Sequence, residues 1–471
     1  MAFLIGGANT ESAAYEIDNS IRMNEADSTK LTNDEMSDGS RDIWTFSGWF
    51  KKTNVGETGD SHLFSCGTGG TELTHITLRG SGDAEQIKCE NYVDSGSTTR
   101  WAITTPGSYR DPTAWYHLVL AVDTTQASIS NGLKLWINGV AISYTGSTWV
   151  QNADTCMNSD DHENVIGARQ NNNDMFFDGY LAEINFIDGT QKQSTDFGKF
   201  NSNGVWIPIK YSGSYGTNGY SLEFKGTGTN ADASGMGADT SGNGHHFSFH
   251  NLASANGDTC TDTPTNNFCT LNSIGGANSS GKWTFSEGNC KIQQNDNGSW
   301  RATGSTMAVS KGKWYWEVEF DAGDMSEIFV GVHDSEVSLE GTNRWVNGST
   351  LFYNHNGGEI RQDGTNTSND YGVLTAGDIL GVALNMDDNQ ITFYDNGSAI
   401  ASNFGLSSYI TGFAMPTFLS DSNDIVYKVN FGNAPFSISS GNADANGYGN
   451  FEYAVPTNYY SLCTKNLAEY G

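Results

Sequence analysis

Short runs in which apolar and polar residues alternate are the feature that most limits what this chain can fold into. They recur over residues 43–50, 115–122, 180–187, 313–320 and 377–384. Successive side chains of a β-strand point to opposite faces of a sheet, so a period of two residues is typical of strands. Helical periodicity is almost absent. The pattern therefore predicts an all-β protein.

Turn signals separate these runs. Asp188-Gly189 follows the run 180–187, and Asn138-Gly139 and Asn396-Gly397 follow two further runs, 133–137 and 390–394. Such pairs favour the tight turns of β-hairpins because both residues tolerate positive φ. Strands joined by turns, without crossover helices, indicate antiparallel sheets packed as sandwiches. Residues 226–282 are rich in Gly, Asn, Thr, Ser and Asp and poor in aliphatic residues, so we expect a domain boundary there.

The charge balance limits the partners. Asp and Glu number 54 and Lys and Arg 24, which gives a formal net charge of −30. A field of that sign repels nucleic acid and disfavours anionic membranes, so we expect neither as a partner. The acidity serves either solubility or the attraction of cations and basic partners.

The seven cysteines are widely spaced and include no C-x-x-C pair. A structural zinc site therefore has no support from the sequence. We expect reduced, mostly buried thiols, with a Cys260–Cys269 pair as the alternative. No basic residue precedes Arg22, and the apolar run at the N-terminus is too short for a signal peptide or a membrane span. The expectation is a protein made in a cytoplasm, without membrane insertion.

Catalytic signatures are missing from the sequence. It contains no G-x-S-x-G, H-E-x-x-H or G-x-x-x-x-G-K-[ST]. Glu317 and Glu319 share one face of a predicted strand, but the E-x-D-x-x-E pattern of glycosidases on related folds is incomplete there. We therefore predict no catalytic residues and no enzyme.

Two patterns are candidate metal sites. Asp239, Ser241 and Asn243 form D-x-S-x-N-G, in which alternate oxygen ligands and a glycine suit Ca²⁺. An Asx-rich turn is the alternative, since no acidic ligand follows. The group of His245, His246 and His250 matches a metal cluster loosely, and a polar edge strand is the simpler interpretation.

Aromatic residues in loop-like segments are the candidate ligand-binding groups. Trp101 follows Thr99-Arg100, and Trp345 follows Arg344. Sugars pack on aromatic faces, and protein partners use Trp and Arg as anchors, so we expect Trp101, Arg344 and Trp345 to bind ligand. Alternatively, each Trp closes one end of a sandwich.

The two halves resemble different families. The first half resembles the LamG-like branch of the concanavalin-type jelly rolls in residues 44–50, 115–118, 135–139 and 178–184, with Ala182 where that family usually has Asp. The second half resembles SPRY domains in residues 312–318, 377–382, 391–397 and 429–432. The resemblance implies two tandem concanavalin-like antiparallel β-sandwiches. The predicted parts are an N-terminal docking segment (1–11), a LamG-like domain (12–255), a linker (256–279), a SPRY domain (280–440) and an irregular C-terminal tail (441–471).

The pairing of these halves resembles a class of tailed-phage virion proteins. Its signature segments correspond to residues 15–22, 239–244, 262–268 and 462–467. This resemblance implies a tail-fibre, spike or head-appendage subunit at the virion surface. Such a subunit would form a homo-oligomer and bind other virion proteins and a host-surface glycan or protein. A purely structural capsid decoration and a polysaccharide depolymerase are the alternatives.

Overall fold

The computed structural model forms two compact units. The first domain comprises Glu11–Ser254 and Asp258–Thr265, and the second comprises Met1–Thr10, Ala255–Gly257 and Asn266–Gly471. Nearly all regular structure is β, so the predicted fold class is confirmed. The structure describes residues 4–5, 15–34, 36–56, 59–68, 71–80, 85–170, 174–253, 257–275, 282–295, 300–322, 328–339, 350–354, 358–362, 365–366, 369–406, 409–423 and 425–471.

Two eight-stranded antiparallel sheets build the first domain. The β4 sheet has the order β11 (Val140–Ala141), β10 (Leu133–Ile137), β9 (Tyr116–Asp123), β4 (Ile43–Lys52), β14 (Gly179–Asp188), β2 (Ser20–Met23) and β19 (Thr259–Cys260), with β17 (Tyr220–Leu222) paired to β14. The β6 sheet has the order β12 (Thr145–Trp149), β8 (Thr98–Ser108), β7 (Gln86–Val93), β6 (Glu72–Arg79), β5 (Ser61–Thr68), β13 (Glu163–Ile166), β3 (Lys30–Asn33) and β18 (Ser248–His250).

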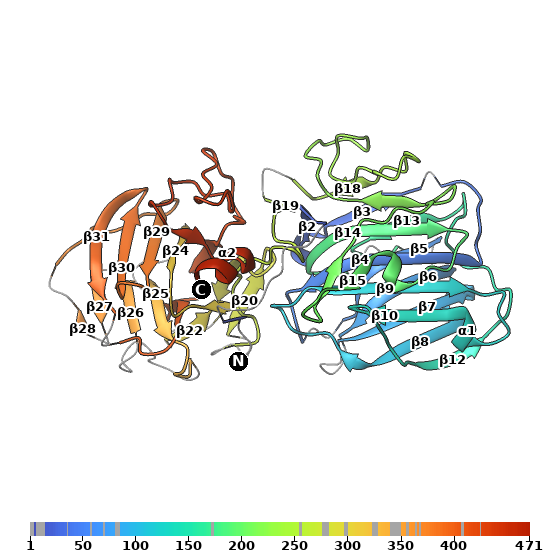
Figure 1. The fold of residues 1–471 in the computed structure, drawn as a ribbon, viewed down its shortest axis with the longest axis horizontal. Coiled ribbons are helices and arrows are strands. Elements are labelled where there is room, and N and C mark those ends of the chain that lie inside the picture. Colours follow the sequence, from blue (N-terminus) through green and yellow to red (C-terminus); the bar gives the residue numbers. More distant parts are fainter. Residues whose placement is uncertain are drawn as a thin grey trace. The chain divides into compact units, whose positions relative to one another are not determined.

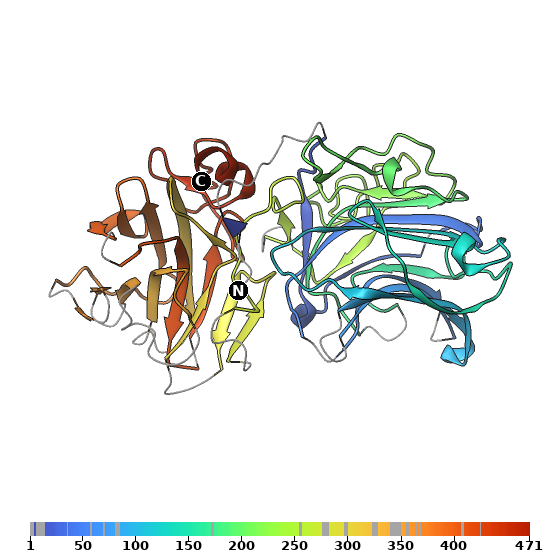
Figure 2. The same ribbon diagram turned by 60° about the horizontal axis from the view of Figure 1, so that its bottom comes forward.

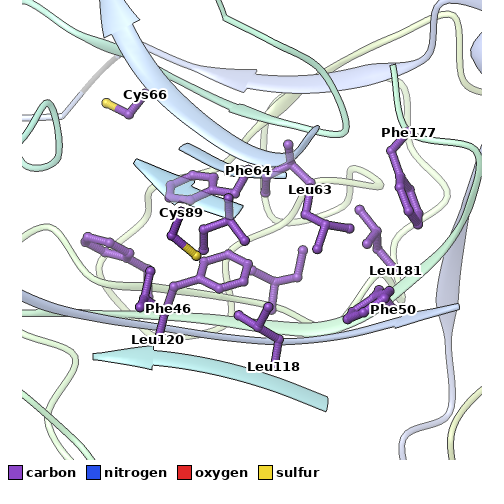
Figure 3. Packing of buried hydrophobic residues seen from close by; sticks show 14 of the residues in the cluster. Phe46, Phe50, Leu63, Phe64, Cys66, Cys89, Leu118, Leu120, Phe177 and Leu181 are labelled. Atoms are coloured by element: carbon purple, nitrogen blue, oxygen red, sulfur yellow. The ribbon is translucent and has the colours of Figure 1, made fainter. Parts of the chain in front are cut away.

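The core of this domain lies between the two sheets (Figure 3). Phe46 of β4 stacks on Phe64 of β5 with ring centroids 5.0 Å apart. Leu120 of β9 and Cys89 of β7 are fully buried beside them. Each buried side chain of this size stabilises the fold by about 2 kcal/mol. Buried side chains of both sheets thus pack against one another in one apolar cluster.

Smaller elements complete the first domain. They are the hairpin of β15 (Gly198–Phe200) and β16 (Trp206–Pro208), the helix α1 (Ile129–Gly132), and the 3₁₀ turns η1 (Glu25–Asp27), η2 (Asp94–Gly96) and η3 (Ser194–Asp196).

The second domain is also a sandwich of two sheets (Figure 1). One sheet has the order β20 (Trp283–Ser286), β21 (Lys291–Gln294), β33 (Val426–Asn430), β24 (Lys313–Ala322), β29 (Ile379–Asn385), β30 (Gln390–Asp395) and β31 (Ser398–Gly405), with β34 (Tyr460–Ser461) paired to β24. The other has the order β22 (Arg301–Gly304), β32 (Ala414–Ser420), β25 (Ile328–Asp334), β26 (Thr350–Asn354), β27 (Glu359–Gln362) and β28 (Thr365–Asn366).

The N-terminal segment differs from the expected docking segment. Strand β1 (Leu4–Ile5) pairs in parallel with β23 (Met307–Ala308) inside the second domain. The backbone of Leu4 and Ile5 is therefore paired with a strand of the same chain, and the docking role of the segment stays a prediction. The rest of the segment predicted for docking, residues 1–3 and 6–11, lies outside the described residues.

The C-terminal segment is anchored, whereas the sequence indicated an irregular tail. It is mostly loop, but it contributes β34 and ends in the helix α2 (Thr464–Tyr470), drawn in red in Figure 2. Two buried carboxylates hold it. Glu317 of β24 accepts hydrogen bonds from the backbone N–H groups of Glu452 (2.9 Å) and Tyr453 (2.8 Å). Asp444 accepts one from Ser461 N–H (2.9 Å).

The predicted linker, 256–279, is built into both domains. Residues Asp258–Thr265 belong to the first domain and Asn266 onward to the second. In the first domain, the Ser20 hydroxyl donates to the Asp262 carbonyl oxygen (2.6 Å), and the Thr265 hydroxyl donates to the Ile17 carbonyl oxygen (2.9 Å). In the second domain, the Thr464 N–H donates to the Asn267 carbonyl oxygen (2.9 Å). These contacts involve three of the four segments that resemble the phage virion proteins, namely 15–22, 262–268 and 462–467.

All seven cysteines are described, and each is a buried thiol outside any disulfide, as expected. Among the described residues, neither α-helix has the length and apolarity that a membrane span needs.

Candidate binding site on the first domain

Trp101 is not a surface residue, so its prediction as a ligand-binding group is wrong. It lies inside strand β8 and is fully buried in the core of the first domain. Strand β8 extends through the segment that the sequence suggested to be a loop, and the alternation along it turns Trp101 inward. Arg344 and Trp345, the other two predicted ligand-binding residues, lie outside the described residues.

Asp239, Ser241 and Asn243 do come together in one turn. The Asp239 carboxylate is 7 % exposed. Its Oδ1 accepts from the backbone N–H groups of Ser221 (2.9 Å) and Ser241 (2.8 Å), and its Oδ2 accepts from the Ser241 hydroxyl (2.9 Å). The Asn243 amide donates to the carbonyl oxygen of Gly219 (2.7 Å). Hydrogen-bond donors of the protein thus occupy the Asp239 carboxylate oxygens that a cation would need. This arrangement favours the Asx-rich turn, and calcium binding stays a prediction.

The three histidines that follow this turn have separate partners. His245 Nε2 lies 2.9 Å from the Thr217 carbonyl oxygen, and His246 Nδ1 accepts from Asp239 N–H at 3.0 Å. His250 Nε2 lies 2.9 Å from the Thr32 hydroxyl. His250 stands on β18, the last strand of the β6 sheet. The polar edge strand is thus the better description of this segment.

The two acids of β24 have structural partners. Glu317 is fully buried, and burial raises the pKa of its carboxyl group although four hydrogen bonds oppose that shift. Glu319 accepts from Lys428 Nζ at 2.9 Å. Both carboxylates are thus engaged by partners within the second domain.

A surface hollow of about 600 Å³ lies at the β18 edge of the β6 sheet. Strands β3 and β18, with the residues at their ends, and Phe176 surround it. Its lining residues are Ser28, Lys30, Phe176, Phe249, His250 and Asn251.

The local structure holds the polar side chains of this hollow in place. His250 and Lys30 are paired across the two strands, so both side chains lie on the same face. Burial, and then the charge of Lys30, lowers the pKa of His250, so its imidazole is neutral at pH 7. The Asn251 amide donates to the Asp27 carbonyl oxygen (2.8 Å). The hollow thus combines apolar ring surface with a fixed imidazole, a hydroxyl and one ammonium group.

Its chemistry suits the binding of a hydroxylated ligand. Phenylalanine rings supply an apolar surface, while Ser28, His250 and Lys30 offer hydrogen bonds. None of the six lining residues is acidic, so the pair of carboxyl groups that glycoside hydrolysis needs is absent from the lining. Sequence reasoning missed this hollow because Phe176 and Phe249 come from distant segments and meet only after the sheet has formed.

Comparisons with protein families agree with this architecture. Residues 24–195 match the model of the concanavalin A-like lectin/glucanases superfamily, and residues 313–433 match that of the SPRY domain. The chain therefore contains a LamG-like, concanavalin-type domain followed by a SPRY domain. None of the curated proteins compared matches the chain.

Parts of the chain are also similar to solved structures. The SPRY domain of human HERC1 is 17 % identical, with a TM-score of 0.26 over 30 % of this chain and 86 % of that one. A heptameric SAP-like pentraxin from Limulus polyphemus is 15 % identical, with a TM-score of 0.28 over 38 % of this chain and 80 % of that one. The CBM40 of the Ruminococcus gnavus IT-sialidase is 14 % identical, with a TM-score of 0.26 over 33 % of this chain and 80 % of that one.

Proposed function

We propose that this chain is a non-enzymatic binding protein of a phage virion surface, a tail-fibre, spike or head-appendage subunit whose hollow binds a host-surface glycan. The hollow carries the glycan part of the proposal, because it pairs apolar rings with neutral and basic hydrogen-bonding groups and has no acidic lining residue. The virion part rests on the four signature segments. As a homo-oligomer, the subunit would multiply weak contacts into firm attachment.

The test is a glycan array probed with the purified chain and with the double variant Lys30→Ala, His250→Ala. Both side chains line the hollow, so we expect the variant to bind the selected glycan at least about tenfold more weakly, a loss of about 1.4 kcal/mol. Lys134→Ala is the matched control, because Lys134 stands on β10 of the other sheet. Equal binding by the double variant and the parent would refute the role of the hollow.

Two further results would favour the alternatives. A chain that binds no glycan but is incorporated into particles would be a capsid decoration or spacer. Release of reducing sugar from host capsule by the purified chain would make it a depolymerase, contrary to the proposal.

A further inference from the structure

Three side chains with metal-binding atoms meet at one end of the first sandwich. They are Glu72, Cys156 and His162, and one ligand atom from each lies within 4.8 Å of the other two. Glu72 opens strand β6, while Cys156 and His162 belong to the loop that joins β12 to β13. The cluster lies in the first domain and includes no residue that lines the hollow.

The backbone on both sides of Cys156 is fixed. Its N–H donates to the Thr74 hydroxyl (2.9 Å), and its carbonyl oxygen accepts from the Cys66 thiol (2.9 Å). His162 directly precedes β13, where Glu163 pairs with Gly67 of β5. The thiol and the imidazole are therefore held against the sheet by main-chain contacts, which is the rigidity that a metal site needs.

The His162 ring is the unusual member of the cluster. It is 6 % exposed, yet neither ring nitrogen makes a hydrogen bond. Glu72 Oε2 lies 3.6 Å from His162 Nε2. Buried polar atoms without a partner are rare because each costs about 1–3 kcal/mol. A cation between the imidazole and the carboxylate would be bound by one ring nitrogen of His162 and by Glu72.

We propose that Glu72, Cys156 and His162 bind Zn²⁺. Thiolate sulfur, imidazole nitrogen and carboxylate oxygen are the ligands that zinc takes in proteins, and three of them leave a fourth position for water. Binding transfers the thiol proton to solvent. The two anionic ligands then balance the charge of the ion.

Arg41 competes for the same carboxylate. Its Nη2 lies 3.8 Å from Glu72 Oε2, its side chain is 28 % exposed, and its Nε donates to the Thr155 carbonyl oxygen (2.9 Å). The ion would take over from Arg41 as the partner of Glu72. No motif in the sequence indicates this site, because 84 residues separate Glu72 from Cys156. The sequence argument against zinc considered only closely spaced pairs of cysteines and therefore did not test a site of this kind.

The first test uses the full chain, stripped of metal with a chelator. It is titrated with Co²⁺, which reports its ligands by absorption, and the metal content after Zn²⁺ loading and dialysis is measured by mass spectrometry. We expect one Zn²⁺ per chain, a thiolate-to-cobalt charge-transfer band, and loss of that band on addition of Zn²⁺. A spectrum without the thiolate band, or no retained zinc, would overturn the proposal without any variant.

Variants then assign the ligands. Cys156→Ser and His162→Gln should each weaken Zn²⁺ binding by at least about 100-fold. Cys89→Ser is the matched control, since Cys89 is a buried thiol of the same core surrounded by apolar side chains (Figure 3), and it should bind Zn²⁺ like the parent. An equal loss in the control and in Cys156→Ser would overturn the assignment. If a ligand variant does not fold, the cobalt spectrum of the parent decides.

Discussion

At the scale of single residues, the direction in which an aromatic side chain points decides whether it supports the fold or can bind a ligand. Trp101 looked exposed because Thr and Arg precede it, yet β8 turns it into the core. His117 of β9 is similar. Its ring stacks on Trp49 with centroids 4.6 Å apart, its Nδ1 accepts from Trp206 Nε1 (3.0 Å), and its Nε2 lies 2.9 Å from the Ser47 hydroxyl. The tryptophan donor fixes the neutral tautomer, so this histidine supports the fold.

Replacement of Trp101 tests its structural role. Trp101→Ala removes a fully buried ring and should lower the free energy of unfolding by about 3–5 kcal/mol, measured by urea denaturation. Val140→Ala, at a position that is 54 % exposed, should change it by about 0.5 kcal/mol or less. A Trp101→Ala protein as stable as the parent would restore Trp101 as a candidate surface residue.

At the scale of elements, the segment Asp258–Thr265 is an integral part of the first domain. Its strand β19 pairs with β2. The buried Asp262 carboxylate forms an ion pair with Lys51 of β4 and accepts from Trp115 Nε1 (3.1 Å). Lys51 Nζ also lies 4.7 Å from the centre of the Tyr180 ring. A stretch that resembles a linker in composition thus carries one of the main polar contacts of this domain.

This contact predicts a large effect of one substitution. Asp262→Ala leaves the Lys51 ammonium group buried without its anion, so the first domain should lose about 3–5 kcal/mol of stability in thermal or urea unfolding. The double variant Lys51→Met, Asp262→Ala also removes the buried ammonium group and should recover part of that loss. A double variant no more stable than the single one would show that the charge is not the cause.

At the scale of the whole molecule, the first domain carries three buried histidines on its two sheets. Burial lowers the pKa of His62 and of His117 to about 3, and it lowers the pKa of His75 as well. In the unfolded chain these histidines have pKa values near 6.5. Between about pH 3 and pH 6.5 the unfolded chain therefore binds more protons than the native state. Stability is therefore present above about pH 6.5 and falls as the pH falls, by about 1.4 kcal/mol per pH unit for each histidine.

Buried carboxyl groups act in the opposite sense, among them Glu183 and Asp258 of the first domain and Glu317 of the second. Burial raises the pKa of Glu183 to about 7, although the Tyr15 hydroxyl bonds to it. Between about pH 5 and 6.5 the three histidines outweigh Glu183, so urea unfolding should show a net loss of about 2 kcal/mol per pH unit as the pH falls. His62→Gln should reduce that slope by about 1 kcal/mol per unit. A slope independent of this substitution would contradict the neutral, buried state of His62.

The sequence by itself determined the strands and the two sandwiches. Alternation and turn pairs are local signals, and strands joined by tight turns can bury their apolar faces only as packed antiparallel sheets. The motifs that matched the two families lie on such strands. Anchoring of the C-terminal segment by Glu317 was decided by tertiary structure, since its partners follow 135 and 136 residues later.

Only the tertiary structure decided which side chains meet. The hollow joins Phe176 to β18, and the metal-binding cluster joins the start of β6 to a loop before β13. Both depend on strand order and register, and a shift of one residue would turn every side chain of a strand to the other face. Local pattern cannot specify contacts between residues so far apart in the chain, so both sites became visible only in the folded molecule.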